Sequence, residues 1–492
     1  MGKYVCSIDQ GTTSTRAILF DKNGNKCFVA QREVSMSYPH PGWVEQDALE
    51  IYVSVIDVIN EVVVKSNISF QDIDCIGITN QRETTVVWEK STGLPIYPAI
   101  VWQSKQSQTI CEEKKKYESE IHRKTGLRLN PYFSASKLRF ILDVTHRQQD
   151  AEDGKLLFGT IDSWLIYKLT GGKVHATDIT NASRTMLFHI QKRDWDEELL
   201  QIFQIPRVML PQVRPCSYHY GDATFFGTDI KIPITGVAGD QQASLFGQTC
   251  FHAGDLKNTY GTGCFMLMNT GETPVYSKNG LLTTIAWEIP GEVNYALEGS
   301  VFMGGACVQW LRDQLKVIST AAETEEAAKE VKDSDGVYII PAFAGLGTPY
   351  WDDDARGAIF GMTRGTTKNH IIRAVLEAIA YQSKDVIEVM KKESGLSLQS
   401  LSVDGGATAN GYLMQFQADI LHTNILLPTC LETTALGAAY FAGLTTGFYD
   451  SKEQLSHIHQ AEKTYVPSMK KKEIAERYKK WKVAVKATRM FK

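Results

Sequence analysis

Two short apolar runs separated by a polar turn open the chain. Residues 4–8 are mostly apolar, residues 9–16 hold one glycine and four hydroxyl side chains, and apolar residues resume at 17–20. Two such runs joined by a turn of this composition predict a β-hairpin. A second turn of the same design occupies residues 258–263 and precedes the apolar residues 264–268. The chain is therefore predicted to be internally duplicated, with one hairpin in each half.

Strand-like and helical stretches alternate in both halves of the chain. Residues 74–79 and 337–341 are short, largely apolar runs that are typical of strands. Residues 371–380 have the apolar spacing of a helix. This alternation predicts an α/β fold rather than a helix bundle or a β-sandwich.

Two charged stretches of the second half predict exposed helices. Residues 313–336 are rich in Glu and Lys, which indicates a solvated face without chemistry. Residues 470–492 are basic and carry apolar residues at helical spacing, so we expect this helix to pack through an apolar stripe. Binding to a membrane surface is the alternative. The stripe consists of Ile474, Tyr478, Trp481 and Val485.

Composition narrows the classes of function. A chain of 492 residues with 43% hydrophobic and 22% charged residues is typical of a globular protein with two or three domains. A net charge of -4 gives no general attraction for nucleic acid, so we expect no nucleic-acid partner. No apolar run approaches the ~20 residues of a membrane helix, so no membrane span is expected. Nine scattered cysteines without a Cys-x-x-Cys pair predict reduced thiols, a cytoplasmic protein and no zinc site.

The first turn carries groups that suit a phosphate. Backbone N–H groups and hydroxyls converge in such a turn, and Asp9 at the strand end would hold Mg²⁺ through water. These residues predict a nucleotide phosphate loop. The alternative is ordinary hairpin chemistry, because the same turn residues also occur in proteins that bind nothing.

Several longer motifs resemble the FGGY carbohydrate kinase family, in the family's order and nearly end to end. They include Asp9-Gln-Gly-Thr-Thr-Ser, Asn80-Gln-Arg-Glu-Thr-Thr, Gly239-Asp-Gln-Gln, Asn258-Thr-Tyr-Gly-Thr-Gly, Val403-Asp-Gly-Gly-Ala and the segment 178–184. The resemblance implies two actin-like (ribonuclease H-like) domains with a catalytic cleft between them. Residues 1–251 would bind glycerol and phosphate, and residues 252–492 would bind the adenine nucleotide.

The resemblance also implies a reaction. ATP and Mg²⁺ would serve the phosphorylation of glycerol to sn-glycerol 3-phosphate, the first step of glycerol catabolism, in a homo-oligomer that is a dimer or a tetramer. Two alternatives stay open. A pentulose kinase of the same family would keep Asp240 but alter the wall around the acceptor, and an actin-like ATP-binding protein would lack an acceptor base.

Asp240 is the residue on which the implied chemistry depends. The resemblance makes it the base that accepts the proton of the glycerol hydroxyl, and also a ligand of Mg²⁺. An aspartate that opens a helix is equally a structural N-cap. An Arg-Glu pair such as 82–83 is, on its own, more often a surface ion pair. The implied acceptor-binding residues are Arg82, Glu83, Trp102, Tyr132, Asp240, Gln241 and Phe265.

The resemblance places the nucleotide along residues of both halves. The residues expected to contact phosphates are Thr12, Thr13, Ser14 and Arg16 on one side and Thr262 on the other. The residues expected to border adenine and ribose are Gly305, Gln309, Gly406 and Asn410. Residues 405–406 are alternatively a tight turn from a strand into a helix.

Residues 222–231 depart from two regulatory patterns of the family. Some relatives are inhibited by fructose bisphosphate through a Gly-Gly-x-Gly-Gly-Thr-Arg loop, whose glycine pattern and arginine this segment lacks. Others carry a histidine here that a phosphotransferase protein phosphorylates, and this segment has none. We expect neither regulation in its usual form, and His219 just upstream is the alternative phosphorylation site.

Overall fold

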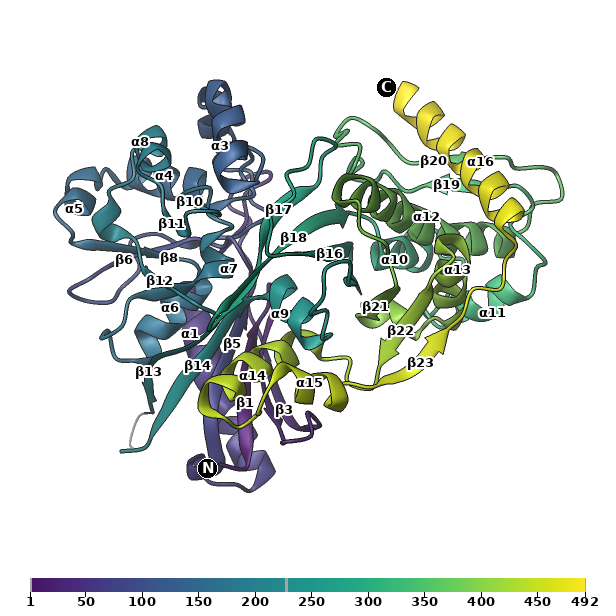
Figure 1. The fold of residues 1–492 in the computed structure, drawn as a ribbon. Helices are drawn as coiled ribbons and strands as arrows, with labels where there is room; N and C mark the ends of the chain where they lie inside the picture. Colours follow the sequence, from purple (N-terminus) through teal and green to yellow (C-terminus); the bar gives the residue numbers. More distant parts are fainter. Residues whose placement is uncertain (1, 226–228, 492) are drawn as a thin grey trace.

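Two β-sheets organise the chain, and the computed structural model describes residues 2–225 and 229–491 (Figure 1). The first sheet has the strand order β13-β14-β5-β1-β2-β3. Strands β1, β2 and β3 pair antiparallel, whereas β5 runs parallel to β1 and β14 runs parallel to β5. The strands are β1 (Tyr4–Gln10), β2 (Ser14–Phe20), β3 (Lys26–Glu33), β5 (Ile73–Asn80), β13 (Ser217–Thr224) and β14 (Lys231–Gly239).

Helices cover both faces of the first sheet because its strands are apolar on both sides. Cys6 and Ile8 of β1 pack into a core with α1 (Ala48–Ser66) and α6 (Ile161–Leu169). The alternate residue Val5 packs on the opposite face, in a core that includes α14 (Thr433–Thr446). Successive strand residues point to opposite faces, which explains this division. The sheet is therefore the middle of three layers.

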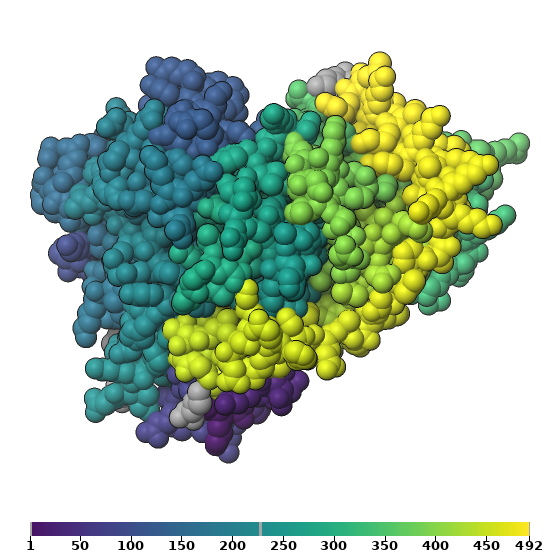
Figure 2. All heavy atoms as spheres, in the orientation of Figure 1, coloured from purple at the N-terminus to yellow at the C-terminus, as the bar shows by residue number. Residues whose placement is uncertain are grey.

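Helix α14 comes from the end of the second half but lies on the first sheet. Ser7 Oγ donates a hydrogen bond to the carbonyl oxygen of Ala435 at 2.7 Å. A Cβ atom at Gly77 would lie 2.3 Å from the carbonyl oxygen of Ala438, so glycine permits this close approach. In the space-filling view, the yellow-green segment that contains α14 adjoins the purple N-terminal residues (Figure 2).

The second sheet repeats the opening arrangement of the first. Its strand order is β17-β18-β16-β15-β21-β22-β23, and β15 pairs antiparallel with β16 and parallel with β21. The strands are β15 (Leu256–Tyr260), β16 (Cys264–Gly271), β17 (Leu282–Ile289), β18 (Glu292–Val301), β21 (Ser400–Asp404), β22 (Asn424–Pro428) and β23 (Ala461–Tyr465). Its longer helices are α10 (Gly305–Asp313), α12 (Lys368–Ser394), α13 (Gly411–Leu421) and α16 (Lys471–Met490).

Shorter elements complete both halves. The short helices are α2 (Gln108–Glu113), α3 (Glu118–Thr125), α4 (Ser134–Thr145), α5 (Gln148–Glu152), α7 (Ile179–Ala182), α8 (Glu197–Phe203), α9 (Asp240–Gly247), α11 (Glu323–Lys329) and α15 (Lys452–Ile458). The two-stranded sheets pair β4 (Glu45–Gln46) with β7 (Ala99–Ile100), β6 (Val86–Glu89) with β8 (Leu156–Gly159), β9 (Ala176–Asp178) with β12 (Gln212–Arg214), β10 (Phe188–His189) with β11 (Asp194–Trp195), and β19 (Tyr338–Ile340) with β20 (Ala358–Phe360). The α/β class predicted from the sequence is confirmed.

The predicted elements differ from the observed ones mainly in length. The helix expected within 313–336 is the much shorter α11, and the helix expected at 371–380 lies inside α12. The C-terminal helix α16 buries Ile474, Trp481 and Val485, as its apolar stripe predicts. None of the helices that the structure describes combines the length and apolar character needed to span a membrane. The domain boundary after residue 251 stays a prediction.

Candidate active site

The turn between β1 and β2 is held from the side by two polar side chains. Trp102 Nε1 donates a hydrogen bond to Thr12 Oγ1 at 2.9 Å, and Gln46 Nε2 donates to the Thr12 carbonyl oxygen at 2.7 Å. Thr13 is exposed and Ser14 is partly exposed. The turn is therefore fixed at Thr12 and leaves two hydroxyl side chains accessible to a ligand.

Asp9 is a carboxyl group in an acidic neighbourhood. It lies opposite Arg16 in the β1–β2 register, and Arg16 Nη1 forms a salt bridge with Glu432 Oε2 at 2.8 Å. Burial raises the pKa of Asp9 to about 7; Arg16 opposes this shift, whereas Asp240 and Glu432 add to it. A bound cation would favour the ionised form of Asp9.

Arg82 and Glu83 follow the end of β5 and are deeply buried. Their side chains are 2% and 1% exposed, so they do not form a surface ion pair. Glu83 has φ of 62°, a conformation that non-glycine residues rarely adopt, and its carbonyl oxygen accepts a hydrogen bond from Ser134 Oγ at 3.1 Å. The surrounding packing therefore holds this strained turn in place.

Five charged side chains form a connected group, which we call the acceptor charge cluster: Arg82, Glu83, Arg184, Asp240 and Glu298. Arg82 Nη1 and Nη2 donate to the two carboxylate oxygens of Glu298 at 2.6 and 3.1 Å, and Arg82 Nε lies 3.2 Å from Asp240 Oδ1. Arg184 Nε donates to Glu83 Oε1 at 2.6 Å, and Arg184 Nη2 donates to Glu298 Oε1 at 3.0 Å. Glu298 belongs to β18, so the cluster joins side chains of both halves.

The pKa values of two carboxylates of the cluster, Glu298 and Asp240, are shifted in opposite directions. Burial alone would raise the pKa of Glu298, but the guanidinium groups of Arg184 and Arg82 outweigh it and lower the pKa to about 2. Loss of surrounding water raises the pKa of Asp240, although Arg82 and Lys257 oppose this shift. The Asp240 side chain is 31% exposed, whereas that of Glu298 is fully buried. Asp240 is thus the most exposed carboxylate of the cluster.

Asp240 is the first residue of α9, and the N-cap position belongs to Gly239. Asp240 Oδ1 accepts a hydrogen bond from the backbone N–H of Gln241 at 2.7 Å. Asp240 is therefore not the N-cap residue of α9, which was the structural alternative for it; the N-cap lies one residue earlier.

Aromatic side chains lie beside the cluster. The rings of Trp102 and Tyr132 meet edge to face with centroids 5.5 Å apart, and the Arg184 guanidinium lies 5.8 Å from the Tyr132 ring centre. Phe265 lies on β16, partly exposed. The structure therefore brings Tyr132 to the cluster, places Trp102 against Tyr132, and places Phe265 on the second sheet.

The turn between β15 and β16 is bonded to the start of α10. The carbonyl oxygen of Thr262 accepts hydrogen bonds from Gly304 N–H at 2.9 Å and from Ala306 N–H at 3.1 Å. Gly305 N–H donates to the Gly261 carbonyl oxygen at 2.8 Å. The structure therefore brings the predicted residues Thr262 and Gly305 together. Within the described part of the chain, no hydrogen bond joins this turn to the β1–β2 turn.

The predicted nucleoside residues Gln309 and Asn410 lie on two different helices, α10 and α13. Gln309 is exposed on α10. Asn410 caps α13, because its Oδ1 accepts a hydrogen bond from Leu413 N–H at 2.9 Å, and its Nδ2 donates to Thr324 Oγ1 at 3.0 Å. Asn410 therefore has a structural role in addition to any contact with a nucleotide.

The two glycines of the turn after β21, Gly405 and Gly406, have different surroundings. Gly405 has φ of 92°, and a Cβ atom there would lie 2.5 Å from the Tyr260 carbonyl oxygen, so this residue makes the tight turn. Gly406 is exposed, and a Cβ atom there would meet nothing within 4 Å. Only Gly406 borders open space.

Three charged residues of the site were missed from the sequence: Arg184, Lys257 and Glu298. Arg184 ends one of the family motifs, and Glu298 is an isolated acid in a largely apolar strand, so both gave a signal. Lys257 is a fully buried lysine of β15 whose Nζ donates to Gln241 Oε1 and, at 2.9 Å, to Thr259 Oγ1. The predicted residue Gln241 thus meets the second sheet through Lys257.

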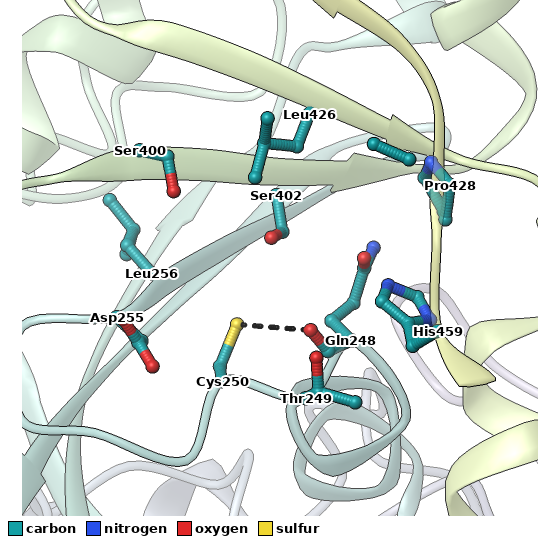
Figure 3. Close-up of a pocket in the computed structure, with 11 residues that line it drawn as sticks. Gln248, Thr249, Cys250, Asp255, Leu256, Ser400, Ser402, Leu426, Pro428 and His459 are labelled. Carbon is teal, nitrogen blue, oxygen red and sulfur yellow. Dashed lines mark hydrogen bonds between the residues drawn. The ribbon is translucent and has the colours of Figure 1, made fainter. Parts of the chain in front are cut away.

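A cavity of about 190 Å³ lies beside the end of α9 and contains none of the predicted site residues (Figure 3). Cys250 Sγ donates a hydrogen bond to the Gln248 carbonyl oxygen at 3.8 Å on its wall. Gln248 Nε2 donates to Asp404 Oδ2 at 3.0 Å. The remaining lining residues are Thr249, Asp255, Leu256, Ser400, Ser402, Leu426, Pro428, His459 and Ala461.

His219 lies on β13, the strand at one edge of the first sheet. It is exposed, and its Nε2 lies 3.0 Å from Asp222 Oδ1. Of the segment 222–231, residues 226–228 lie outside the described residues.

Comparison with known proteins places the chain in a family. The N-terminal domain of the FGGY family of carbohydrate kinases matches residues 4–247, and its C-terminal domain matches residues 256–446. The chain belongs to the FGGY family of carbohydrate kinases. This confirms the resemblance that the sequence motifs indicated.

Members of the FGGY family with similar sequences span the full length of the chain. A glycerol kinase of Staphylococcus epidermidis is 56% identical over 498 aligned positions, covering 100% of this chain and 99% of the relative. Glycerol kinase 2 of Thermotoga maritima is 56% identical over 486 positions, covering 98% of each chain. The chain is therefore similar to these FGGY kinases along its whole length, including the segments that form the site.

Solved structures of the FGGY family share the fold. The crystal structure of Plasmodium falciparum glycerol kinase with ADP has a TM-score of 0.94 and 37% identity, covering 99% of this chain and 98% of that chain. A ligand-bound xylulose kinase of Lactobacillus acidophilus has a TM-score of 0.88 at 23% identity, covering 98% and 97%. The second likeness shows the shared fold alone.

Proposed function

We propose that the protein transfers the γ-phosphoryl group of ATP to glycerol, giving ADP and sn-glycerol 3-phosphate. The observation that carries this proposal is the acceptor charge cluster, in which Asp240 is the most exposed carboxylate and its Oδ1 lies 3.2 Å from Arg82 Nε. The relatives described above as glycerol kinases support the choice of glycerol.

The acceptor binds through charged and polar groups that are already fixed in direction. Arg82 and Glu83 supply the charged hydrogen-bond partners for glycerol hydroxyls, and such bonds are the stronger kind. Tyr132 also contacts the glycerol hydroxyls, Trp102 and Phe265 cover the carbon skeleton, and Gln241 holds the same end of the substrate. Because glycerol is small, a rigid set of partners places its reacting oxygen with little residual motion.

Asp240 is the base in this proposal. The attacking hydroxyl oxygen forms a bond to the γ-phosphorus while the bond from that phosphorus to the bridging oxygen of ADP breaks, and the hydroxyl proton moves to the Asp240 carboxylate. The raised pKa of Asp240 makes it a better proton acceptor than an ordinary exposed aspartate.

The phosphates lie between the two hairpin turns in this proposal. Thr12, Thr13, Ser14 and Arg16 contact them from one side, and Thr262 contacts them from the other. Gly305, Gln309, Gly406 and Asn410 border adenine and ribose. The exposed face of Gly406 supports this placement, since a flat base needs open space beside the backbone.

The residues around Asp9 suit Mg²⁺. Asp9 and Asp240 are acidic neighbours, and within residues 2–225 and 229–491 no group of three His, Cys, Asp or Glu side chains forms a metal cage. Mg²⁺ usually keeps several waters and uses one or two carboxylates together with substrate phosphates. Asp9 would hold the ion through water and Asp240 would complete its protein ligands. When bound, the ion would neutralise phosphate charge.

The test is ADP release from Mg-ATP with glycerol, dihydroxyacetone, xylulose and ribulose offered separately. We expect a preference for glycerol that Asp240→Asn abolishes, while the control Asp47→Asn at the start of α1 keeps wild-type activity. Turnover of xylulose or ribulose with glycerol ignored would identify a pentulose kinase instead. ATP turnover that ignores every acceptor and survives Asp240→Asn would identify an actin-like ATP-binding protein.

A cytoplasmic location and a homo-oligomer, dimer or tetramer, complete the proposal. All nine cysteines are free, which fits a reducing compartment. Sedimentation of the purified protein at micromolar concentration tests the oligomer, and a monomer alone would refute it.

A further inference from the structure

Lys257 is a buried lysine that connects the two sides of the proposed site. It lies on β15, the strand that runs into the turn containing Thr262, and its side chain has no exposed surface. Its Nζ donates a hydrogen bond to Gln241 Oε1, next to Asp240, and another to Thr259 Oγ1 at 2.9 Å. One ammonium group therefore contacts the acceptor side and the nucleotide side together.

The charges around Lys257 are acidic on balance. Asp404 on β21, Asp240 on α9 and Glu298 on β18 favour its protonated form, and Arg82 opposes it. Burial is the largest effect and lowers the pKa of Lys257 to about 8. The amine is therefore still mostly protonated at neutral pH.

The hydrogen bonds of Lys257 go to neutral acceptors, although carboxylates lie nearby. Both hydrogen-bond acceptors, Gln241 and Thr259, are neutral, and among the described residues Lys257 makes no salt bridge. The nearby Asp404 accepts hydrogen bonds through Oδ2, from Ser244 Oγ at 2.8 Å, from Gln248 Nε2 at 3.0 Å and from Thr433 Oγ1. Its Oδ1 is buried and has no hydrogen-bond partner among the described residues, and Lys257 does not reach it. An ammonium carries three donors, so one N–H of Lys257 remains for another acceptor.

A buried ammonium that bonds to no carboxylate directly is costly, and a phosphoryl oxygen of a bound nucleotide would supply the missing anionic acceptor. We infer that Lys257 is a catalytic residue that donates a hydrogen bond to the phosphoryl group during its transfer from ATP to the acceptor. The inference rests on the proposed function and adds a residue to it.

The role follows from where negative charge resides during transfer. The oxygens of the moving phosphoryl group carry that charge while one P–O bond forms at the acceptor and the other breaks at ADP. The acceptor proton goes to Asp240, and Lys257 keeps all its own protons. A fixed cation beside this path lowers the barrier because it needs no reorganisation when the charge arrives.

The test compares Lys257→Met with the matched control Lys384→Met. Lys384 is also a buried lysine of the second half, on α12, with its Nζ 3.4 Å from Glu388 Oε1. We expect Lys257→Met to lower kcat by ~100-fold or more, as loss of one fixed donor to a transition state does. Lys384→Met should keep kcat within about twofold of wild type, since a residue remote from the reacting atoms adds nothing there.

A binding measurement separates contact with the phosphoryl group from a structural role. Calorimetric titrations with Mg²⁺ compare ADP with the β,γ-imido analogue of ATP for each variant. Lys257→Met should lose about tenfold or more in affinity for the imido analogue and much less for ADP, because only the analogue carries the γ-phosphoryl group that accepts this charge-assisted hydrogen bond. Equal losses for the two nucleotides, or kcat within threefold of wild type, would overturn the inference.

Two further measurements apply if the first variant does not fold or if the wild-type protein is inactive with glycerol. If Lys257→Met does not fold by near-ultraviolet circular dichroism, Lys257→Gln is titrated in the same way, and a retained preference for the imido analogue over ADP refutes the role of Lys257. If the wild-type protein releases no ADP with glycerol, the proposed function fails while the pair of titrations still tests whether Lys257 contacts the γ-phosphoryl group.

Discussion

Glu298 is expected to be the costliest single charge to remove from the acceptor charge cluster. Glu298→Gln keeps the shape of the side chain but replaces one acceptor oxygen by an NH₂ group that faces guanidinium donors. The carboxylate accepts three hydrogen bonds, two from Arg82 at 2.6 and 3.1 Å and one from Arg184 at 3.0 Å. The substitution therefore leaves two buried cations partly uncompensated.

The loss of unfolding free energy caused by Glu298→Gln follows from the burial of the ion pair and from the pKa of Glu298. Breaking a buried ion pair by changing one partner costs ~3–5 kcal/mol. The lowered pKa of Glu298, about 2 against an ordinary 4.5, has the same sign, and at ~1.36 kcal/mol for each pKa unit it corresponds to roughly 3 kcal/mol. We therefore expect Glu298→Gln to lower the free energy of unfolding by ~3 kcal/mol.

The assay is urea unfolding followed by far-ultraviolet circular dichroism, with Glu288→Gln as the matched control. Glu288 lies on β17 and forms one salt bridge with Arg193 at 3.0 Å, with side chains 21% and 46% exposed. Exposed pairs of this kind contribute ~0–1 kcal/mol. If Glu298→Gln destabilises the protein no more than Glu288→Gln does, the cluster does not stabilise the fold as argued here.

The remaining predictions concern pH, packing and regulation. The pKa of Asp9 is raised to about 7 in the folded protein, whereas the unfolded chain ionises near its ordinary 3.8, so stability falls as pH rises between these values and stays low above 7. Asp9→Asn should therefore raise the melting temperature of the ligand-free protein at pH 8.5 by ~2–4 °C. Scanning calorimetry would show no such gain at pH 4, and an equal gain at both values would contradict the assignment. Gly77→Ala should destabilise the protein by ~1–3 kcal/mol through overpacking against α14. The control Gly365→Ala should not, because the nearest atom to its new Cβ would be 3.7 Å away. Equal urea midpoints for the two variants would argue against this packing. His219→Arg should leave kcat unchanged with or without a phosphorylating phosphocarrier protein, and altered activation would identify His219 as a regulatory site.

The hairpins and the main motifs could be predicted from local patterns in the sequence. The apolar runs around residues 9–16 specify strands through their spacing, and Asp9, Arg82 and Asp240 lie in motifs that can be recognised without a structure. Those parts depend on neighbours in the chain. The family resemblance then supplied the proposed roles.

The contacts that complete the site depend on distant parts of the chain. Arg82 and Glu298 are 216 residues apart, and the sequence around Glu298 does not say which cation it meets. Lys257 precedes a recognised turn, but only the tertiary fold shows that its amine is buried beside Gln241. Burial and pairing over such separations are properties of the packed structure.

The position of α14 has a consequence for synthesis on the ribosome. The last strand of the first sheet, β14, ends at Gly239, and the helix that covers one face of that sheet ends at Thr446. At a synthesis rate of ~5–20 residues per second, about 200 further residues take roughly 10–40 s to appear. During that interval the nascent sheet presents Val5 and its apolar neighbours without their cover, so the nascent chain needs shielding from aggregation until its second half has been made.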